Sequence, residues 1–187
     1  MQTGKSVVMK IESNIELLEN ILEEWKSTIG QDFEGYKNHV YRMVNFCLVL
    51  KKLNDEEFKK IVIAGCFHDI GIWIERTIDY IPPSISQAKK YLIENKLELW
   101  VEEITLMIEE HHKIRSYNNN DYPLVELFRK GDLVDFSLGA IKFGLSKEYI
   151  KSVKNKFSNA GFHKGLVQKT SIWFLRHPFN PLPMMKW

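Results

Sequence analysis

Residues 61–71 of the chain read IVIAGCFHDIG. The first seven are apolar or glycine and, together with Phe58, they keep helical spacing, so this stretch predicts a buried helix that ends near Gly71. His68 and Asp69 stand at the end of that helix. Because burying an unpaired carboxylate costs on the order of several kcal/mol, Asp69 needs a partner, and a divalent cation would supply the opposite charge.

Two interpretations of this His-Asp pair are open. Neighbouring side chains of a helix point about 100° apart, so His68 and Asp69 reach one ion only where the helix ends, and Gly71 permits such an end. The plainer alternative is a histidine at a helix C-terminus followed by a solvated aspartate. The pair alone does not decide between the two.

Helical spacing continues over most of the chain, and no alternating pattern typical of a strand is convincingly long. The predicted helices cover residues 11–25 with an end near Gly30, 40–50, 58–68, 84–92, 99–112, 123–132, a segment after Ser146, and 166–174 with an end at Pro178. We therefore expect an all-α, single-domain helical bundle of about seven or eight helices over residues 1–187.

Polar residues and prolines indicate where some of these helices begin. Asn54 or Asp55 supplies a break and an N-cap before the helix of the His-Asp pair. Pro82 and Pro83 stop any helix before them, and Ser84 then fits the capping-box pattern that opens the next helix.

The C-terminal part, residues 146–187, is expected to pack on a motif-bearing core of about residues 36–138. The tail from Pro178 onward contains three prolines and is not expected to be helical. Its large apolar residues predict that it packs back onto the body: Phe179, Leu182, Met184, Met185 and Trp187.

Composition indicates an ordinary globular protein. The 187 residues are 44% hydrophobic and 27% charged, and the net charge of +2 gives no reason to expect a nucleic-acid partner. Cys47 and Cys66 lie in apolar runs and are expected to be reduced core thiols. No stretch approaches the roughly 20 apolar residues of a membrane span. We expect a cytoplasmic protein without a membrane partner, and its oligomeric state is open.

Another histidine lies on an apolar helix face. Met43, Phe46 and Leu50 continue the face of His39, and an imidazole in such a place must find a partner. Arg42 lies on nearly the same face and places a cation beside it. A core histidine with an ordinary hydrogen bond is the alternative.

Two further polar clusters follow. His111 and His112 end a helix, where only one of two adjacent side chains is expected to face inward squarely; a solvated helix end is the alternative. Asp132 and Asp135 lie three residues apart within apolar surroundings. Their alternative interpretation is that one of them pairs with a basic neighbour on the surface.

Together, these residues resemble the HD metal-dependent phosphohydrolase superfamily. The resemblance rests on three motifs: Asn38-His39-Val40-Tyr41-Arg42-Met43, similar to H-x-x-R-[apolar]; Phe67-His68-Asp69-Ile70-Gly71; and Gly131-Asp132-Leu133-Val134-Asp135, similar to A-D-x-[apolar]-[DN] with glycine in place of alanine. It spans roughly residues 36–138. The order His, His-Asp, His-His, Asp across successive helices is what carries it.

The resemblance implies one divalent transition metal ion, of Mn, Fe, Co, Ni or Zn, with four protein ligands. These ligands would be His39, His68, Asp69 and Asp132. Asp135 would then orient a ligand or a water. A second ion would need two further histidines on separate segments, and only the adjacent His111 and His112 are available, so a single ion is expected.

The activity implied is hydrolysis, by metal-activated water, of a small phosphorylated metabolite or a nucleotide. His111 or His112 would act as the catalytic acid or position the phosphate. Arg42 or Arg76 would bind the substrate, with Lys113 and Arg115 as further candidate cations.

Departures from the family pattern leave other functions open. Trp73 stands where several nucleotide-cleaving members have a glutamate, and Ile72 replaces the lysine of the H-D-I-G-K variant, which disfavours the cyclic-dinucleotide subfamily. One alternative is a hydratase or lyase with a tight apolar pocket formed by Phe67, Ile72 and Trp73. Another is a non-catalytic helical binding module. Of the remaining histidines, His163 has no evident partner, and His177 is expected at a helix end.

Overall fold

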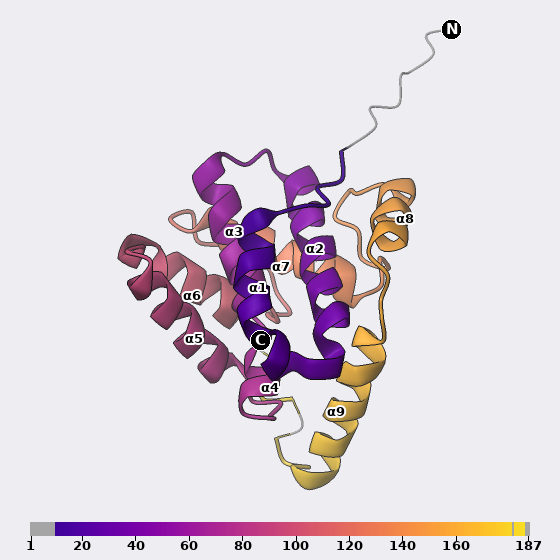
Figure 1. The fold of residues 1–187 in the computed structure, drawn as a ribbon. Coiled ribbons are helices and arrows are strands. Elements are labelled where there is room, and N and C mark those ends of the chain that lie inside the picture. Colours follow the sequence, from indigo (N-terminus) through magenta and orange to yellow (C-terminus); the bar gives the residue numbers. More distant parts are fainter. Residues whose placement is uncertain (1–9, 181, 186–187) are drawn as a thin grey trace, which may run out of the picture.

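The chain folds into a bundle of helices (Figure 1). The computed structural model describes residues 10–180 and 182–185. Its helices are α1 (Glu16–Ile29), α2 (Phe33–Leu50), α3 (Asp55–Phe67), α4 (Gly71–Ile74), α5 (Ile81–Glu94), α6 (Val101–Glu110), α7 (Pro123–Phe136), α8 (Lys147–Lys156) and α9 (Phe162–Arg176), with short 3-10 turns at Gly30–Asp32 and Glu98–Trp100. No β-strand occurs within the described ranges, so the predicted all-α fold class is confirmed. None of the described helices is long and apolar enough to cross a bilayer.

The centre of the bundle is α2, which is buried along most of its length. It packs against α7 and α3, and α1, α5 and α6 pack around α3. Gly131 lets α7 approach α2 closely: a Cβ there would overlap the Cys47 sulfur and lie 3.1 Å from the carbonyl oxygen of Met43. Cys47 and Cys66 are buried and free, as predicted.

The helix before the His-Asp pair has the predicted form. A capping box starts α3: the Asn54 side chain accepts from the Glu57 N–H at 2.9 Å, and the Glu57 carboxylate accepts from the Asn54 N–H at 3.0 Å. The helix ends at Phe67, and residues 68–70 form a turn before α4. The predicted helix end near the pair is confirmed, although His68 keeps helical backbone angles.

The start of α5 differs from the prediction. The helix begins at Ile81, so Pro82 and Pro83 lie within its first turn. Prolines fit there because the first N–H groups of a helix have no intrahelical acceptor. Ser84 is not an N-cap, and the capping-box prediction was wrong: its buried hydroxyl accepts a hydrogen bond from the Gly71 N–H at 3.0 Å.

Gly71 marks a close approach between α4 and the start of α5. A Cβ at this position would overlap the carbonyl oxygen of Tyr80 and press on Pro83 and Ser84. The glycine is therefore required by contact with the neighbouring segment. This contact places Tyr80 near the turn that carries the His-Asp pair.

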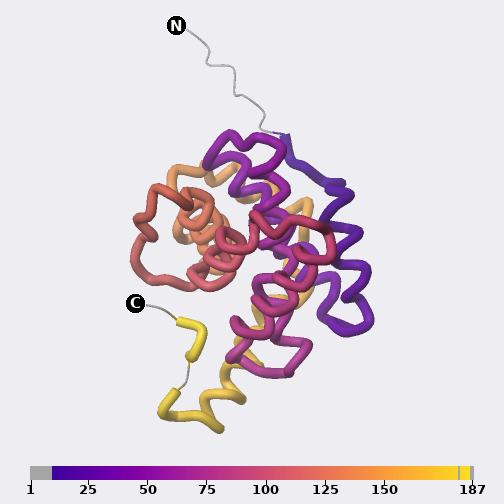
Figure 2. Tube along the Cα trace, turned by 90° about the vertical axis from the view of Figure 1, so that its left-hand side faces the viewer, coloured from indigo at the N-terminus to yellow at the C-terminus, as the bar shows by residue number. Residues whose placement is uncertain are grey.

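The C-terminal part is more exposed than the rest. Ser146 caps α8, as predicted, by accepting from the Tyr149 N–H. Within α9, which is described throughout, Phe162 alone is buried. Figure 2 shows α9 projecting from the end of the bundle and the chain turning back after it. Met184 is buried, which confirms the predicted return of the tail at this residue; Phe179 is fully exposed, and Trp187 lies outside the described residues.

Candidate metal centre

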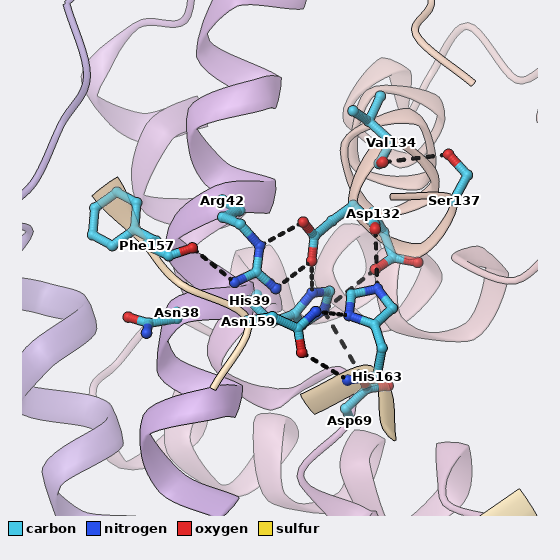
Figure 3. Close-up of polar contacts among 12 residues, drawn as sticks. Asn38, His39, Arg42, Asp69, Asp132, Val134, Ser137, Phe157, Asn159 and His163 are labelled. Atoms are coloured by element: carbon cyan, nitrogen blue, oxygen red, sulfur yellow. Dashed lines mark hydrogen bonds and ion pairs between the residues drawn. The ribbon is translucent and has the colours of Figure 1, made fainter. Parts of the chain in front are cut away.

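Four buried side chains with metal-ligand chemistry meet where α2, α7 and the turn after α3 come together. They are His39, His68, Asp69 and Asp132, called the His/Asp cluster below. The first comes from α2, the next two from the turn, and the last from α7. Figure 3 labels three of them, His39, Asp69 and Asp132. Each is at most 5% exposed. The fold therefore brings together the ligand set expected from the sequence.

The distances within the cluster suit a shared ion. His39 Nε2 lies 3.1 Å from His68 Nε2 and 3.4 Å from Asp132 Oδ1. Asp69 Oδ2 lies 3.3 Å from His68 Nε2 and 4.0 Å from His39 Nε2. Nitrogen and oxygen ligands that bind zinc at about 2.0–2.2 Å lie roughly 3–3.5 Å from one another, so small shifts suffice. Asp132 Oδ1 lies 3.8 Å from His68 Nε2, so both carboxylates lie within 4.0 Å of both imidazoles.

The imidazole rings are oriented by their second nitrogen atoms. The Nδ1 atoms of His39, His68 and His111 lie 2.7, 2.8 and 2.6 Å from their acceptors. These acceptors are, in the same order, the Asp135 carboxylate, the Gly65 carbonyl and the Ile108 carbonyl. Because each Nδ1–H donates, the lone pair of the neutral ring lies on Nε2, and it is the Nε2 atoms that face the carboxylates. Metal-binding histidines adopt this arrangement.

Asp135 orients His39 from behind. Arg42 donates to both oxygens of Asp135, at 2.6 and 2.7 Å. Burial opposes ionisation of Asp135, but the contacts with His39 and Arg42 outweigh it and hold its pKa below the usual range. Figure 3 shows His39 with Arg42 on one side and Asp69 on the other. Arg42 is 2% exposed and also donates to two backbone carbonyls, so its geometry does not support the substrate-binding role predicted for it.

Burial also sets the protonation states within the cluster. It lowers the pKa of His39 to about 4, so this ring is neutral at pH 7, which is the form that binds a metal. Burial raises the pKa of Asp132 to about 7, and the neighbouring carboxylates act in the same direction. Burial opposes ionisation of Asp69 too, but His68 and His111 hold its pKa well below the usual range. The cluster thus combines a neutral imidazole with two buried carboxylates, a set of groups that could hold a cation.

A second group of ligand type shares Asp69. His111 and His112 follow the end of α6, and because they lie in a turn, both rings come close to Asp69. His111 is buried whereas His112 is partly exposed, as expected if only one of the two faces inward squarely. Asp69 Oδ1 and His111 Nε2 lie 3.6 Å apart, and among the described residues neither has a hydrogen-bond partner, so a cation would satisfy both. The binding of a single ion stays a prediction. Its stated reason, a lack of ligands for a second ion, does not hold, because His111 and His112 both lie close to Asp69.

His112 differs from His111 because it faces a cavity. His111 is 2% exposed and buried behind Asp69, whereas His112 lines the cavity and its Nε2 lies 2.5 Å from the Tyr80 hydroxyl. Burial lowers the pKa of His112 well below its usual value and raises that of Tyr80, so both are neutral at pH 7. Tyr80 was not predicted, because it lies in a short connection without periodic pattern or motif.

The cavity next to the cluster has a volume of about 770 Å³. Three members of the cluster, His112 and Tyr80 form its polar end. Its walls come from α9, the end of α7 and the tail, and they are almost entirely apolar. None of the described residues that line it is a lysine or an arginine. Arg76 lines a separate hollow, so the structure does not bring this predicted substrate-binding residue to the cluster.

The apolar pocket expected from three residues near the His-Asp pair is not the one that opens onto the cluster. Phe67 is buried in the core, and Ile72 and Trp73 line the separate hollow. An aromatic residue that contacts the cluster and also lines this cavity is Phe162 of α9, whose ring stacks on His39 at 4.4 Å. No pattern in the sequence connects this residue with the helix of His39, which lies more than a hundred residues earlier.

His163 has partners that the sequence did not reveal. Its Nε2 lies 3.1 Å from the carbonyl oxygen of Asp135, and its Nδ1 contacts the Asn159 side chain. The absence of a partner expected for His163 was therefore wrong. His177 lies at the end of α9, as predicted, and its ring stacks on Trp173 at 3.9 Å.

Comparison with known proteins adds no name to this arrangement. No protein-family model, curated protein or solved structure matches the chain. The resemblance to the HD superfamily therefore stays a prediction drawn from three motifs. The function has to be argued from the geometry of the cluster and of its cavity.

Proposed function

We propose that the chain is a metal-dependent hydrolase of the HD type, in which the His/Asp cluster holds a divalent ion and the adjacent cavity holds a small substrate. One observation carries the proposal: buried imidazoles with their Nδ1 protons already donated direct their Nε2 atoms at buried carboxylates. Such a site contributes little to folding by itself, because it concentrates acidic and unsatisfied polar atoms in the core. A bound cation accounts for it.

The donor set favours a first-row transition metal. Mixed imidazole and carboxylate ligands suit Mn, Fe, Co, Ni or Zn. When bound, such an ion supplies a Lewis acid that makes water nucleophilic near neutral pH. The His/Asp cluster would hold the ion, while Asp135 and Arg42 keep the Nε2 of His39 directed at it.

His112 is the residue that we assign to proton transfer. In phosphoester hydrolysis, water gives its oxygen to phosphorus, the ester P–O bond breaks, and the leaving oxygen takes up a proton. His112 lines the cavity beside the cluster, and its contact with the Tyr80 hydroxyl forms an imidazole–phenol pair that can accept and return a proton. His111 points at Asp69 from the buried side and positions that carboxylate.

The substrate class that we propose is a small phosphomonoester. Because the described lining offers no lysine or arginine, a single phosphate at the metal site is matched better than the several phosphates of a nucleoside triphosphate. A second candidate function is hydration of a small uncharged substrate such as a nitrile. The apolar walls of the cavity favour this alternative.

A substrate panel tests the proposal. Purified protein is assayed with phosphomonoesters and with small nitriles in the presence of Mn²⁺ or Co²⁺. We expect phosphate release that is abolished in His68→Ala and strongly reduced in His112→Ala, but retained in His177→Ala, whose ring lies on Trp173. Phosphate release that is equal in His68→Ala and the wild type contradicts the proposal, and turnover of nitriles alone favours the hydratase.

Metal analysis separates both enzymes from a non-catalytic helical module. A hydrolase or hydratase of this kind is expected to retain about one equivalent of metal or more, and the metal should stabilise the fold. If the protein binds less and Asp69→Ala leaves the melting temperature unchanged, the cluster is not a metal site.

A further inference from the structure

The cavity beside the His/Asp cluster has one polar end and otherwise apolar walls. Its polar end consists of cluster residues, His112 and Tyr80. The opposite wall is built by Val167, Phe174 and Leu175 of α9, and the tail adds Met184 and Met185. Two hydroxyls, those of Thr170 and Ser171, are the other polar groups among the described lining residues.

The apolar wall is exposed although its side chains are large. Val167 is 67% exposed, Phe174 is 53% exposed and Leu175 is 81% exposed. Exposed apolar side chains that converge on one hollow gain from being covered by an apolar group. The volume of about 770 Å³ lies in the range of pockets that bind small organic molecules.

The polar end shows what kind of molecule covers the wall. Asp69, Asp132, His112 and Tyr80 place polar groups at this end, whereas the lining residues of α9 offer only the hydroxyls of Thr170 and Ser171. A purely apolar occupant, such as the face of a second copy of this chain, would leave this end unmatched. A molecule with a polar group at one end and a hydrocarbon portion at the other matches both parts of the cavity.

We infer that the ligand is a small amphiphile, with one phosphate-like group at the His/Asp cluster and a hydrocarbon chain against α9. The head group rests on the proposed function, whereas the hydrocarbon chain rests on the cavity walls alone. The ligand binds as a single molecule from solution. Each methylene that enters the cavity should raise its affinity about fourfold until the walls are covered.

Binding of non-hydrolysable ligands tests the inference without requiring turnover. Ethyl-, butyl-, hexyl- and octylphosphonate, all below their critical micelle concentrations, are titrated calorimetrically into the protein with and without Mn²⁺. We expect affinity to rise with chain length in the wild type. In Leu175→Ser, the fold-change in affinity per added methylene should fall to half of the wild-type value or less. It should persist in Ile172→Ser, because Ile172 is also exposed on α9 but lines the separate hollow.

The two parts of the test fail separately. Phosphonates that bind with no dependence on chain length, or a dependence that Leu175→Ser leaves unchanged, overturn the amphiphile inference. An affinity that rises with chain length but has the same value with and without Mn²⁺ at every length leaves the hydrocarbon part of the inference standing and contradicts the metal-based function.

Other occupants of the apolar wall have their own signatures. A dimer in light scattering that dissociates in Leu175→Ser, together with no phosphonate binding, assigns the wall to a second copy of the chain. Sedimentation with phosphatidylcholine vesicles, together with no binding of monomeric octylphosphonate, assigns it to a bilayer. Either result overturns the inference.

Discussion

The His/Asp cluster and the α9 wall of its cavity are built in opposite ways. The cluster is at most 5% exposed, and hydrogen bonds fix the direction of its imidazoles. In the wall, Val167 is 67% exposed and Leu175 is 81% exposed, and most of the side chains from α9 that line the cavity are apolar. If the proposed function holds, the chemistry and the choice of substrate depend on separate parts of the chain. Changes in α9 should therefore alter ligand preference without loss of the cluster.

The largest effect is expected from the support behind the cluster. Arg42→Ala leaves the Asp135 carboxylate buried without its ion-pair partner, which typically costs about 3–5 kcal/mol of unfolding free energy. Urea denaturation measures the loss. The exposed Arg115 provides the control, since Arg115→Ala should change stability by less than about 0.5 kcal/mol. A loss below about 1 kcal/mol in Arg42→Ala would show that Asp135 does not depend on this partner.

The second effect concerns metal binding at the cluster. A metal at one hundred times its dissociation constant should stabilise the wild type by about 2.7 kcal/mol. The gain should vanish in His68→Ala and persist in His111→Ala if one ion is held by the His/Asp cluster. Thermal unfolding of each variant with and without metal measures it. If His111→Ala loses the stabilisation by metal to the same extent, the second group of ligands around Asp69 also binds metal.

Close packing of α7 on α2 gives the third effect. Gly131→Ala forces a methyl group against Cys47 and Met43, and overpacking of this kind costs about 1–3 kcal/mol. It should also weaken metal binding, because α7 carries Asp132. The matched change in α9 is Gly165→Ala, whose methyl group would meet Lys169 at an ordinary 3.6 Å; it should be neutral or stabilise by up to about 1 kcal/mol. Similar losses of unfolding free energy in Gly131→Ala and Gly165→Ala would show that α7 and α9 do not differ in how closely they are packed.

The smallest effect concerns an ion pair that ties α9 to the bundle. Lys169 Nζ lies 2.7 Å from Asp32, and the pair is partly exposed, so Lys169→Met should cost no more than about 1 kcal/mol. Burial opposes ionisation of Asp32, but hydrogen bonds from Lys169 and Trp73 outweigh it and lower its pKa from 3.8.

The pH dependence of this pair follows from the lowered pKa of Asp32. The stabilisation is present at neutral pH and is lost as the pH falls below 3.8 through the pKa of the folded state. Stability curves of wild type and Lys169→Met should therefore converge in acid, whereas the exposed Lys164→Met should follow the wild type throughout. A difference that persists unchanged in acid would assign the effect of Lys169 to packing.

Local patterns in the sequence were sufficient for the helices. An N-cap at Asn54 or Asp55 and a helix end near the His-Asp pair depend on neighbouring residues, and both could be predicted. Polar residues on apolar helix faces drew attention to His39, the His-Asp pair and Asp132, but the choice of these four as a ligand set came from the resemblance to the HD superfamily. The resemblance also placed Asp135 beside a ligand, where the structure has it in contact with His39.

Contacts between distant segments could not be predicted in this way. Arg42 was expected to bind substrate. Its pairing with Asp135 could not be seen in the sequence, because Asp135 lies ninety-three residues away on another helix. The apolar residues of α9 could be recognised as helical, but not as the wall of a cavity whose polar end lies in α2 and α7. Both histidines after Glu110 reach Asp69 because α6 ends there, one or two residues earlier than periodicity indicated.

Gly71 has a consequence for how the two halves of the site are spaced. Its missing side chain lets the backbone at Tyr80 touch the segment that follows Asp69, and its N–H is held by Ser84. Any larger residue would push the Tyr80 backbone outward and carry the phenol away from His112. The absence of a side chain at Gly71 therefore sets the distance between the proposed proton-transfer pair, His112 and Tyr80, and the proposed metal ligands.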